Sequence, residues 1–168
     1  MRIATWNINS VRLRAHHLES LDKLAAPDVV CLQETKVVDE LFPHHAVADL
    51  YPHRHVRGMK AYNGVAILSK LPFTATGGLD WCGREDARHI SVKVAGGVEI
   101  HNFYVPAGGD VPDPEKNDKF AHKLRFLDEM TNWLGDIASP RAKRVLVGDL
   151  NIAPLESDVW SHKQLLDV

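Results

Sequence analysis

Three short apolar runs, each of strand length and each followed by polar residues, constrain the fold of this chain more than any other feature. They are residues 3–6, which lead into Asn7 and Asn9, residues 29–32, which lead into Gln33 and Glu34, and residues 145–147, which lead into Asp149 and Asn151. Continuous apolar runs of this length are typical of strands buried on both faces. Loops at the carboxyl ends of such strands open the crevice in which α/β proteins bind ligands. We therefore expect these polar side chains to gather at one edge of a sheet.

Helical patterns and hairpin signals fill the rest of the first two thirds of the chain. Ser10 is expected to cap a helix that ends before Pro27, and a short helix is predicted over residues 38–50. Four further strands are expected, at residues 53–57, 64–69, 89–94 and 98–105, the last two joined as a hairpin by Gly96-Gly97. Helices mixed with buried strands and antiparallel hairpins predict an α/β fold with a mixed sheet.

The longest helix is predicted after a loop rich in Gly, Pro and Asp. Asp113 would be its N-cap and Pro114 its first residue, since Asp and Pro favour these two positions. Apolar residues at helical spacing follow, and Ser139-Pro140 would end the helix. A last helix is expected to begin near Asp158.

Length, composition and charge exclude several classes of protein. The chain has 168 residues and a mass of 18.8 kDa, which corresponds to one domain over residues 1–168. With 45% hydrophobic and 25% charged residues it is expected to be a soluble globular protein without a membrane span. Cys31 and Cys82 have no zinc-binding spacing, which favours free thiols and a cytoplasmic location. The net charge of −2 argues against a protein that coats nucleic acid, but it is compatible with an enzyme that holds a few phosphates.

The polar residues at the three strand ends have the chemistry of a site for a hard cation. Glu34 and Asp149 offer carboxylates, and Asn7 and Asn151 offer amide oxygens, which are the ligands that Mg²⁺ prefers. Each of these residues alone is more typical of a helix cap or a solvated turn. Their recurrence at three strand ends makes a magnesium site and the ordinary structural interpretation about equally favoured.

Four motifs in this order resemble the exonuclease III and abasic-site endonuclease family of the endonuclease/exonuclease/phosphatase superfamily. They are residues 6–12 (WNINSVR), 27–36 (PDVVCLQETK), 62–70 (YNGVAILSK) and 148–154 (GDLNIAP). The resemblance implies a deoxyribonuclease I-like fold, a four-layer αββα sandwich with mixed β-sheets, of which the C-terminal portion is missing here. It also implies a Mg²⁺-dependent DNA-repair nuclease, with Mn²⁺ as a possible substitute. Such an enzyme removes nucleotides in the 3′-to-5′ direction from double-stranded DNA and incises abasic-site DNA.

The resemblance further implies roles for five residues. Glu34 would be the metal carboxylate, and Asn7 would support the metal site. Asp149 would orient or deprotonate the attacking water, Asn151 would hold the scissile phosphate, and both would lie at the metal. Tyr104 falls where the family places a phosphate-contacting tyrosine. These roles agree with physical chemistry, because a phosphodiester is anionic and resists attack until a cation neutralises its oxygens.

Three basic residues are expected to contact the DNA backbone, where phosphate contacts supply most of the affinity. They are Arg12, Lys36 and Arg88. For each of them a solvated surface cation is an equally good interpretation.

One part of the family pattern is not found in this sequence. The family ends in a Ser-Asp-His motif, and the chain contains no Asp-His dipeptide. We therefore expect the natural chain to continue past Val168 as a monomer, and we expect a sheet face to lie exposed here, where a truncated form could associate. The alternatives are an inactive fragment that only binds DNA or a partner, and a superfamily phosphatase or phosphodiesterase.

The chain also contains ten histidines and an unusual loop. The pairs His16-His17 and His44-His45 and the alternating His53 and His55 are expected to be surface residues, because no third ligand has a suitable spacing. The loop at residues 81–84 could either touch DNA or pack against the core.

Overall fold

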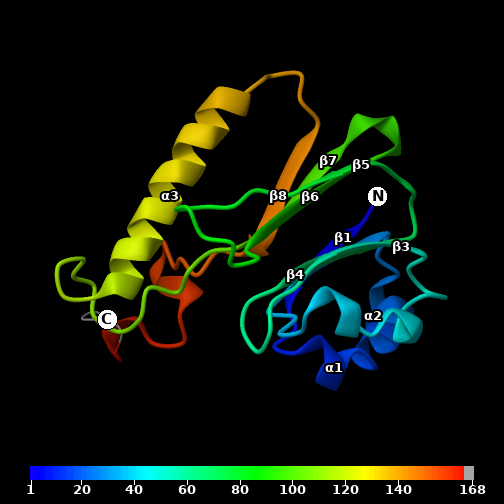
Figure 1. The fold of residues 1–168 in the computed structure, drawn as a ribbon, viewed down its shortest axis with the longest axis horizontal. Coiled ribbons are helices and arrows are strands. Elements are labelled where there is room, and N and C mark those ends of the chain that lie inside the picture. The colour runs from blue at the N-terminus through cyan, green and yellow to red at the C-terminus, as the bar shows by residue number, and fades with distance from the viewer. Residues whose placement is uncertain (165–168) are drawn as a thin grey trace. The chain divides into compact units, whose positions relative to one another are not determined.

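Within residues 1–164, the part of the chain that the computed structural model describes, the strands form two four-stranded mixed sheets (Figure 1). The first sheet has the order β1 (Ile3–Asn7), β2 (Val29–Gln33), β4 (Val65–Ser69) and β3 (His53–Arg57). The second has the order β5 (Phe73–Gly77), β6 (His89–Val94), β7 (Glu99–Tyr104) and β8 (Arg144–Asp149). The pairs β1–β2 and β7–β8 are parallel and the others antiparallel, which confirms the predicted mixed α/β fold.

Both sheets belong to one compact unit, formed by Met1–Tyr104 and Ser139–Asp149. A second unit contains Val105–Ala138 and the chain from Leu150 onward, and its main element is helix α3 (Asp118–Ile137). Each unit is described by itself below.

The two sheets of the first unit pack face to face through alternate residues of their strands. Val29 and Cys31 of β2 lie in this layer with Ile90 and Val92 of β6 and with Ile100 of β7, and all five are buried. Such alternation follows from the strand period of two, which sends successive side chains to opposite faces. The expected exposed sheet face is therefore not found at β2, β6 and β7, whose inner faces cover one another. Thr5 of β1, which pairs with Cys31 on the same face, is exposed.

Helices cover the other face of the first sheet (Figure 1). They are α1 (Val11–Arg14), α2 (His17–Ala25) and two 3₁₀ turns, Asp39–Leu41 and His44–Ala46. The predicted cap at Ser10 is wrong. Ser10 has a φ of 84° and makes no side-chain cap, and its backbone N–H donates instead to the carbonyl of Glu34 at 2.8 Å. A backbone hydrogen bond to the neighbouring strand end thus replaces the local cap.

The helix predicted over residues 38–50 is also wrong, because Pro43 interrupts it. The residue before a proline is pushed away from the helical region, and Phe42 is extended, with φ −63° and ψ 133°. Only the two 3₁₀ turns on either side of this point remain. The strand β5 was not predicted, since its exposed residues Thr74, Ala75 and Thr76 show no apolar alternation.

In the second unit, α3 begins four residues after Pro114 and not at Asp113 as predicted. Asn117 is its N-cap and accepts a hydrogen bond from the backbone N–H of Lys119 at 3.0 Å. Asp113 closes the preceding turn, where its side chain accepts from the N–H of Glu115. The helix ends just before Ser139-Pro140, as predicted. No helix in the described part of the chain is long and apolar enough to cross a membrane.

The helix predicted from Asp158 is replaced, up to residue 164, by two 3₁₀ turns, Glu156–Asp158 and His162–Gln164. The side chain of Asp158 accepts from the N–H of Leu155 at 3.1 Å and so closes the first turn, and Val159 is extended. The remainder of that predicted helix, residues 165–168, lies outside the described residues.

Candidate functional site

Asn7 joins the two predicted carboxylates at the carboxyl ends of β1, β2 and β8. Its side-chain Nδ2 donates to Glu34 Oε1 at 2.8 Å and to Asp149 Oδ2 at 2.7 Å. Asn7 is the last residue of β1, Glu34 follows β2 directly, and Asp149 is the last residue of β8. Strand ends from both sheets therefore meet at one amide group.

Tyr104 completes this cluster from the end of β7. Its hydroxyl donates to Glu34 Oε1 at 2.9 Å, and it pairs with Asp149 in the parallel register of β7 and β8. The close approach of these strands requires a glycine at position 148, because a Cβ there would lie 2.0 Å from the carbonyl oxygen of Phe103. Gly148 thus brings Asp149 beside Tyr104.

Lys36 contacts the same carboxylate from the other side. Its Nζ lies 2.7 Å from Glu34 Oε2 and also donates to Asn9 Oδ1 at 2.6 Å. Both Glu34 and Lys36 have a left-handed backbone, with φ of 54° and 53°. Residues with side chains rarely adopt this conformation, and it is common at functional sites, where the surrounding structure enforces it. Here the backbone N–H groups of Thr35 and Lys36 donate to the loop before β4.

These contacts set the protonation of Glu34 and Tyr104. Burial by itself raises the pKa of Glu34, but hydrogen bonds from Asn7, Lys36 and Tyr104, with the charge of Lys36, bring that pKa below its ordinary value. Burial, followed by the hydrogen bond to Glu34 and its charge, raises the pKa of Tyr104 to about 12. At neutral pH Glu34 is therefore an anion, and Tyr104 is a phenol that can donate a hydrogen bond.

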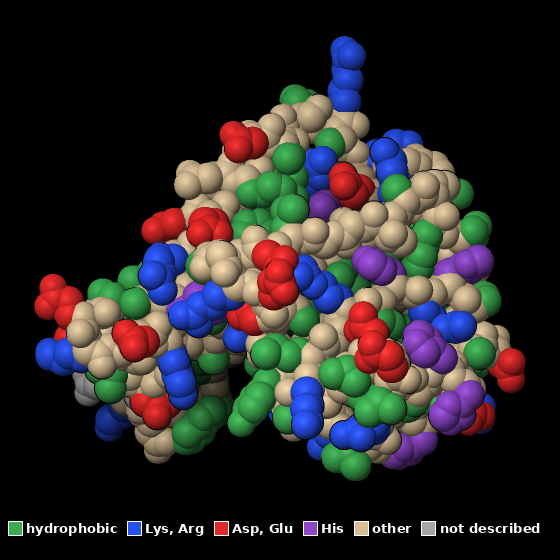
Figure 2. Space-filling view, viewed as in Figure 1, with side chains coloured by type: hydrophobic (Ala, Val, Ile, Leu, Met, Phe, Trp, Pro, Cys, Tyr) green, Lys and Arg blue, Asp and Glu red, His purple; other side chains and the backbone are tan. Residues whose placement is uncertain are grey.

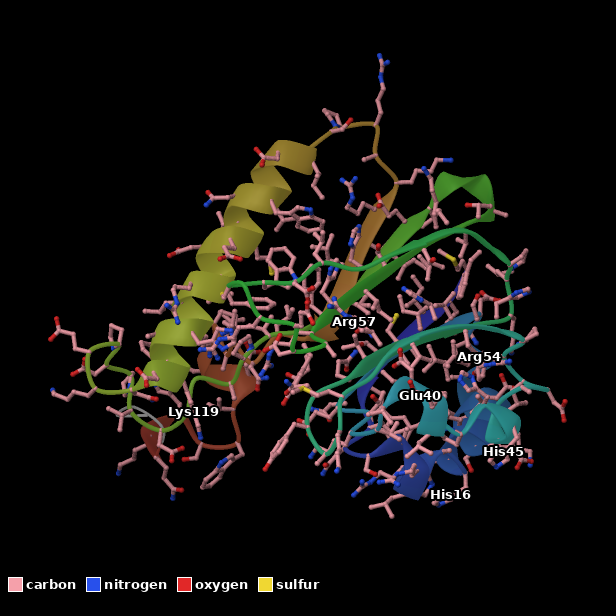
Figure 3. The ribbon with its side chains drawn as sticks, viewed as in Figure 1. His16, Glu40, His45, Arg54, Arg57 and Lys119 are labelled. Carbon is pink, nitrogen blue, oxygen red and sulfur yellow. The ribbon has the colours of Figure 1, made fainter. Side chains whose placement is uncertain are left out.

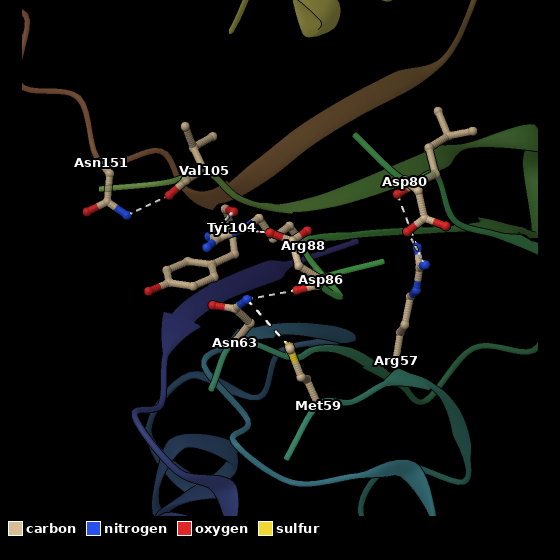
Figure 4. A network of polar contacts seen from close by, with 10 residues as sticks. Arg57, Met59, Asn63, Asp80, Asp86, Arg88, Tyr104, Val105 and Asn151 are labelled. Atoms are coloured by element: carbon tan, nitrogen blue, oxygen red, sulfur yellow. Dashed lines mark hydrogen bonds and ion pairs between the residues drawn. The ribbon is translucent and has the colours of Figure 1, made fainter. Parts of the chain in front are cut away.

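The three basic residues predicted to contact DNA lie in different surroundings. Arg12 is exposed on α1, whereas Lys36 is engaged with Glu34. Arg88 is largely buried, its side chain only 13% exposed, and it pairs with Asp86 (Figure 4). The structure thus gives Arg88 protein partners that the sequence pattern did not predict.

Asn151 belongs to the second unit. Its side-chain Nδ2 donates to the carbonyl of Val105 at 2.8 Å (Figure 4). Its own carbonyl accepts from Lys123 Nζ at 2.6 Å. The role of Asn151 at the metal and the scissile phosphate stays a prediction.

Two buried amides behind the site were not predicted. Gln33 Nε2 donates to Asn102 Oδ1 at 2.6 Å, and Asn102 Nδ2 donates to the carbonyls of Leu32 and Ala66 at 2.9 and 3.0 Å. The pair joins the second sheet to β2 and β4 of the first. The sequence signal that could have revealed Asn102 is the alternation of β7. Ile100, Asn102 and Tyr104 share one face of the strand, and Asn102 is a polar residue beside the buried Ile100 on that face.

The donor set fits a divalent cation that keeps much of its water. Glu34 and Asp149 bring two carboxylates to one amide group, and carboxylate oxygens are hard ligands. The amide of Asn7 faces them with its Nδ2, while its Oδ1 accepts from the N–H of Asn9. Among residues 1–164, no group of three or more His, Cys, Asp or Glu side chains is placed to hold a metal. In sites that act on phosphates, Mg²⁺ is usually bound by one or two protein carboxylates and keeps several water ligands.

The exposed histidines lie apart from this cluster. His16 and His45 project from the helices and turns that cover the first sheet (Figure 3). The space-filling view shows histidines over this region and acidic and basic side chains intermixed on the viewed face (Figure 2). The viewed face therefore shows no broad basic patch.

Comparison with known proteins defines the class to which this fold and this site belong. Residues 4–167 match the model of the Endonuclease/Exonuclease/phosphatase family, and the chain belongs to that family. The match confirms the resemblance seen in the four motifs.

Particular relatives are exodeoxyribonuclease III of Haemophilus influenzae, 31% identical over 95% of this chain, and DNA repair nuclease APEX1 of Danio rerio, 30% identical over 97%. The chain spans 60% and 53% of the lengths of these two proteins.

Solved structures confirm the fold class. An AP endonuclease from Archaeoglobus fulgidus superposes with a TM-score of 0.88 at 35% identity, covering 99% of this chain and 64% of the other. The 3′ phosphatase NExo from Neisseria, bound to product DNA hairpin, gives a TM-score of 0.86 at 30% identity over 98% of this chain and 63% of the other. The deoxyribonuclease I-like α/β fold expected from the motifs is thus the fold of this chain.

Proposed function

We propose that this chain carries much of the active site of a Mg²⁺-dependent DNA-repair nuclease of the exodeoxyribonuclease III type. The observation that carries the proposal is the amide of Asn7, which holds the carboxylates of Glu34 and Asp149 together beside the hydroxyl of Tyr104. The names of its relatives, an exodeoxyribonuclease and a DNA repair nuclease, support DNA as the substrate. The proposed substrate is double-stranded and abasic-site DNA, and the likeness to an AP endonuclease supports the second.

In this proposal Glu34 and Asp149 hold the metal ion, and Asn7 supports the site by holding the two carboxylates through its Nδ2. Mg²⁺ bound there supplies positive charge that neutralises the phosphoryl oxygens and the leaving oxygen. Glu34 is suited to this role because its pKa is lowered and it stays ionised. Lys36 keeps the carboxylate of Glu34 oriented through its ion pair at 2.7 Å.

The remaining residues act on the water and the phosphate. The carboxylate of Asp149 accepts a proton from the attacking water, as a general base within hydrogen-bond reach can do. The hydroxyl of Tyr104, protonated up to about pH 12, donates a hydrogen bond to a phosphate oxygen as negative charge grows on it. Asn151 holds the scissile phosphate, and the exposed Arg12 contacts the DNA backbone.

The substitution Glu34→Gln in the full-length protein tests the metal assignment. The variant keeps the shape of the side chain and removes its charge, so we expect Mg²⁺-dependent incision of an abasic duplex to fall about 10²–10³-fold. Calorimetry should also show weaker binding of Mg²⁺ alone. Glu19→Gln, an exposed acid on α2, is the matched control and should incise normally. Wild-type incision by the Glu34→Gln variant would contradict the assignment.

A second candidate is a phosphatase that removes a 3′ phosphate from DNA. It is favoured by the Neisseria structure, whose protein is named a 3′ phosphatase. Three substrates separate the possibilities: an abasic duplex, a duplex with a 3′ phosphate, and a small phosphoester. A repair nuclease should hydrolyse the abasic duplex fastest. A protein that binds the duplex without hydrolysing any of the three would be the inactive binding form.

A further inference from the structure

The side chain of Arg88 is held against Tyr104 by two contacts of its own, one ion pair with Asp86 and one backbone hydrogen bond between the two residues. Its guanidinium carbon lies 4.9 Å from the centre of the Tyr104 ring, and its Nη1 donates to the carbonyl of Tyr104 at 3.2 Å. Its Nε donates to Asp86 Oδ2 at 2.5 Å. The backbone N–H of Tyr104 donates in turn to the carbonyl of Arg88 at 2.8 Å. Arg88 thus contacts the ring, the backbone carbonyl and the backbone N–H of Tyr104.

Asp86 is itself fixed by the loop before β4. Asn63 Nδ2 donates to the carbonyl of Asp86 at 2.9 Å (Figure 4). The carbonyl of Asn63 accepts from the backbone N–H of Lys36 at 3.0 Å. Lys36 is the residue that pairs with Glu34, and Glu34 accepts from Tyr104. The contacts therefore close a ring that begins and ends at the site.

We propose that Arg88, oriented by Asp86, is a positioning residue that fixes the phenol of Tyr104 for the reaction, and that it is not a contact to DNA phosphate. The inference rests on the proposed function. It replaces the DNA contact that the sequence pattern suggested for Arg88.

The geometry favours positioning because a planar guanidinium can do three things at once. It covers the face of the ring, donates along its edge to the Tyr104 carbonyl, and pairs with Asp86. A phenol attached to a strand end can rotate about its side-chain bonds, so a group that covers the ring restricts the position of the hydroxyl. The hydroxyl must meet Glu34 Oε1, which lies 2.9 Å away.

The surroundings of Arg88 argue against a phosphate contact. The side chains of Arg88 and Asp86 are only 13% and 15% exposed, and their charges offset one another. A cation gains affinity for DNA by releasing counterions from the phosphates, which requires an exposed charge that is not already neutralised. Arg12, exposed on α1, meets that condition and Arg88 does not.

The substitution Arg88→Lys in the full-length protein separates the two roles. It retains the positive charge and removes the planar fork. If Arg88 positions Tyr104, kcat for incision of an abasic duplex falls about 10–100-fold, while KM and the slope of log Kd against log salt stay unchanged. If Arg88 contacts a phosphate, the Lys variant keeps most of its kcat, and Arg88→Ala raises Kd and reduces the salt slope by about one. Arg12→Ala is the matched control and should show this second pattern.

A double variant tests whether Arg88 acts through Tyr104. If it does, Arg88→Lys combined with Tyr104→Phe is no slower than Tyr104→Phe alone, because the hydroxyl that Arg88 orients is already absent. Independent, multiplied losses in kcat would overturn the proposal.

A readout that does not depend on activity comes from ¹⁹F NMR of protein labelled with fluorotyrosine. The chain has three tyrosines, and Tyr104→Phe identifies the Tyr104 signal. Arg88→Lys should shift or broaden that signal and leave those of Tyr51 and Tyr62 in place. An unchanged Tyr104 signal would overturn the positioning role even if nuclease activity proved absent. If Arg88→Lys fails to fold, Asp86→Asn weakens the same contact with Arg88 in place and should change the same signal.

Discussion

The first unit contains two polar clusters, the Glu34 site and the pair His89–His101, which differ in how deeply they are buried and in their charge. The Glu34 site lies at strand ends, where the side chain of Glu34 is 18% exposed and keeps its charge through Lys36 and two hydrogen bonds. His89 and His101 lie on the adjacent strands β6 and β7 and are only 1% and 3% exposed. In these two clusters, the charged carboxylate stays partly exposed among its partners, and the more deeply buried histidine pair is held in its neutral form.

The histidine pair is arranged for two neutral rings. The backbone N–H of Leu79 donates to His89 Nδ1 at 3.1 Å, so the proton of a neutral His89 lies on Nε2, which faces His101 Nδ1 at 3.0 Å. The two rings stack with an interplanar angle of 4°, and the ring of Phe103 lies 4.3 Å from that of His89. Trp81 also packs its ring against His89, so the loop at residues 81–84 contributes a core residue.

The largest expected effect is on activity, from Asp149→Asn. We expect kcat for DNA hydrolysis to fall about 10²–10⁴-fold because the amide cannot accept the proton of the attacking water. Stability should change little, since the amide oxygen can still accept from Asn7. Single-turnover cleavage and urea unfolding measure the two quantities. Normal cleavage by Asp149→Asn would contradict the role of Asp149 in the reaction.

The second prediction concerns the dependence of stability on pH. Burial, then the nearby charges of His101 and Arg57, lowers the pKa of His89 to about 3, and burial lowers that of His101 against the opposing charge of Glu99. Between about pH 6.5 and about pH 3 the unfolded chain binds more protons at His89 than the folded chain does, so stability falls as the pH falls. From about pH 7 to about pH 4.5 we expect His89 to lower the free energy of unfolding by roughly 2–3 kcal/mol.

Urea unfolding at several pH values measures this loss. His89→Gln should flatten the curve in that range, and His16→Gln, an exposed histidine, should leave it unchanged. Equal curves for the wild type and His89→Gln would show that His89 binds a proton as readily in the folded chain as in the unfolded chain.

The third prediction concerns the buried amides behind the site. Asn102→Ala removes the hydrogen bonds to Gln33, Leu32 and Ala66 and should lower the free energy of unfolding by about 2 kcal/mol, because buried polar groups lose their partners. Chemical denaturation provides the value. Asn132→Ala, exposed on α3, is the control. A loss no larger than that of the control would mean that these amides do not join the sheets energetically.

The smallest expected effect lies outside both clusters. Ala26 follows α2 in a left-handed conformation, with φ 42° and ψ 55°. Ala26→Gly relieves that strain, although glycine loses more freedom on folding, and the net gain should be about 0.5 kcal/mol with unchanged nuclease activity. A thermal melt and an incision assay measure both. A loss of activity would show that the backbone conformation at Ala26 affects the Glu34 site.

Most strands could be predicted from the sequence, as could the grouping of Asn7, Glu34 and Asp149. Apolar runs of strand length have few alternatives to burial in a sheet, and parallel strands such as β1 and β2 bring their carboxyl ends, with Asn7 and Glu34, to one edge. The expectation of a single sheet was wrong for Asp149, which comes from β8 of the second sheet. The hairpin at Gly96-Gly97 and the end of α3 before Ser139-Pro140 were equally local, because glycine and proline act on the backbone directly. The four motifs added the family, which the family match confirmed.

Local capping signals failed where a tertiary contact competed with them. A cap contributes only about 1 kcal/mol. The N–H of Ser10 instead bonds to Glu34, and Asp113 closes a turn ahead of α3. Pro43 divided a stretch whose composition favoured a helix. Only the outcome at Ser10 depends on a residue that a short window of sequence does not contain, because Glu115 lies beside Asp113 and Pro43 lies within the predicted helix.

The sequence alone determined which residues stand at the ends of the buried strands, and hence which chemistry is available there. Only the tertiary structure decided how they are used: Asn7 bonds to Asp149 across 142 positions of the chain, Lys36 pairs with Glu34, and Arg88 is buried against Tyr104. The physical reason is range. Strand and turn preferences act over a few neighbouring residues, whereas the charge and hydrogen bonding of a side chain depend on whatever the packed sheets place within about 3 Å of it.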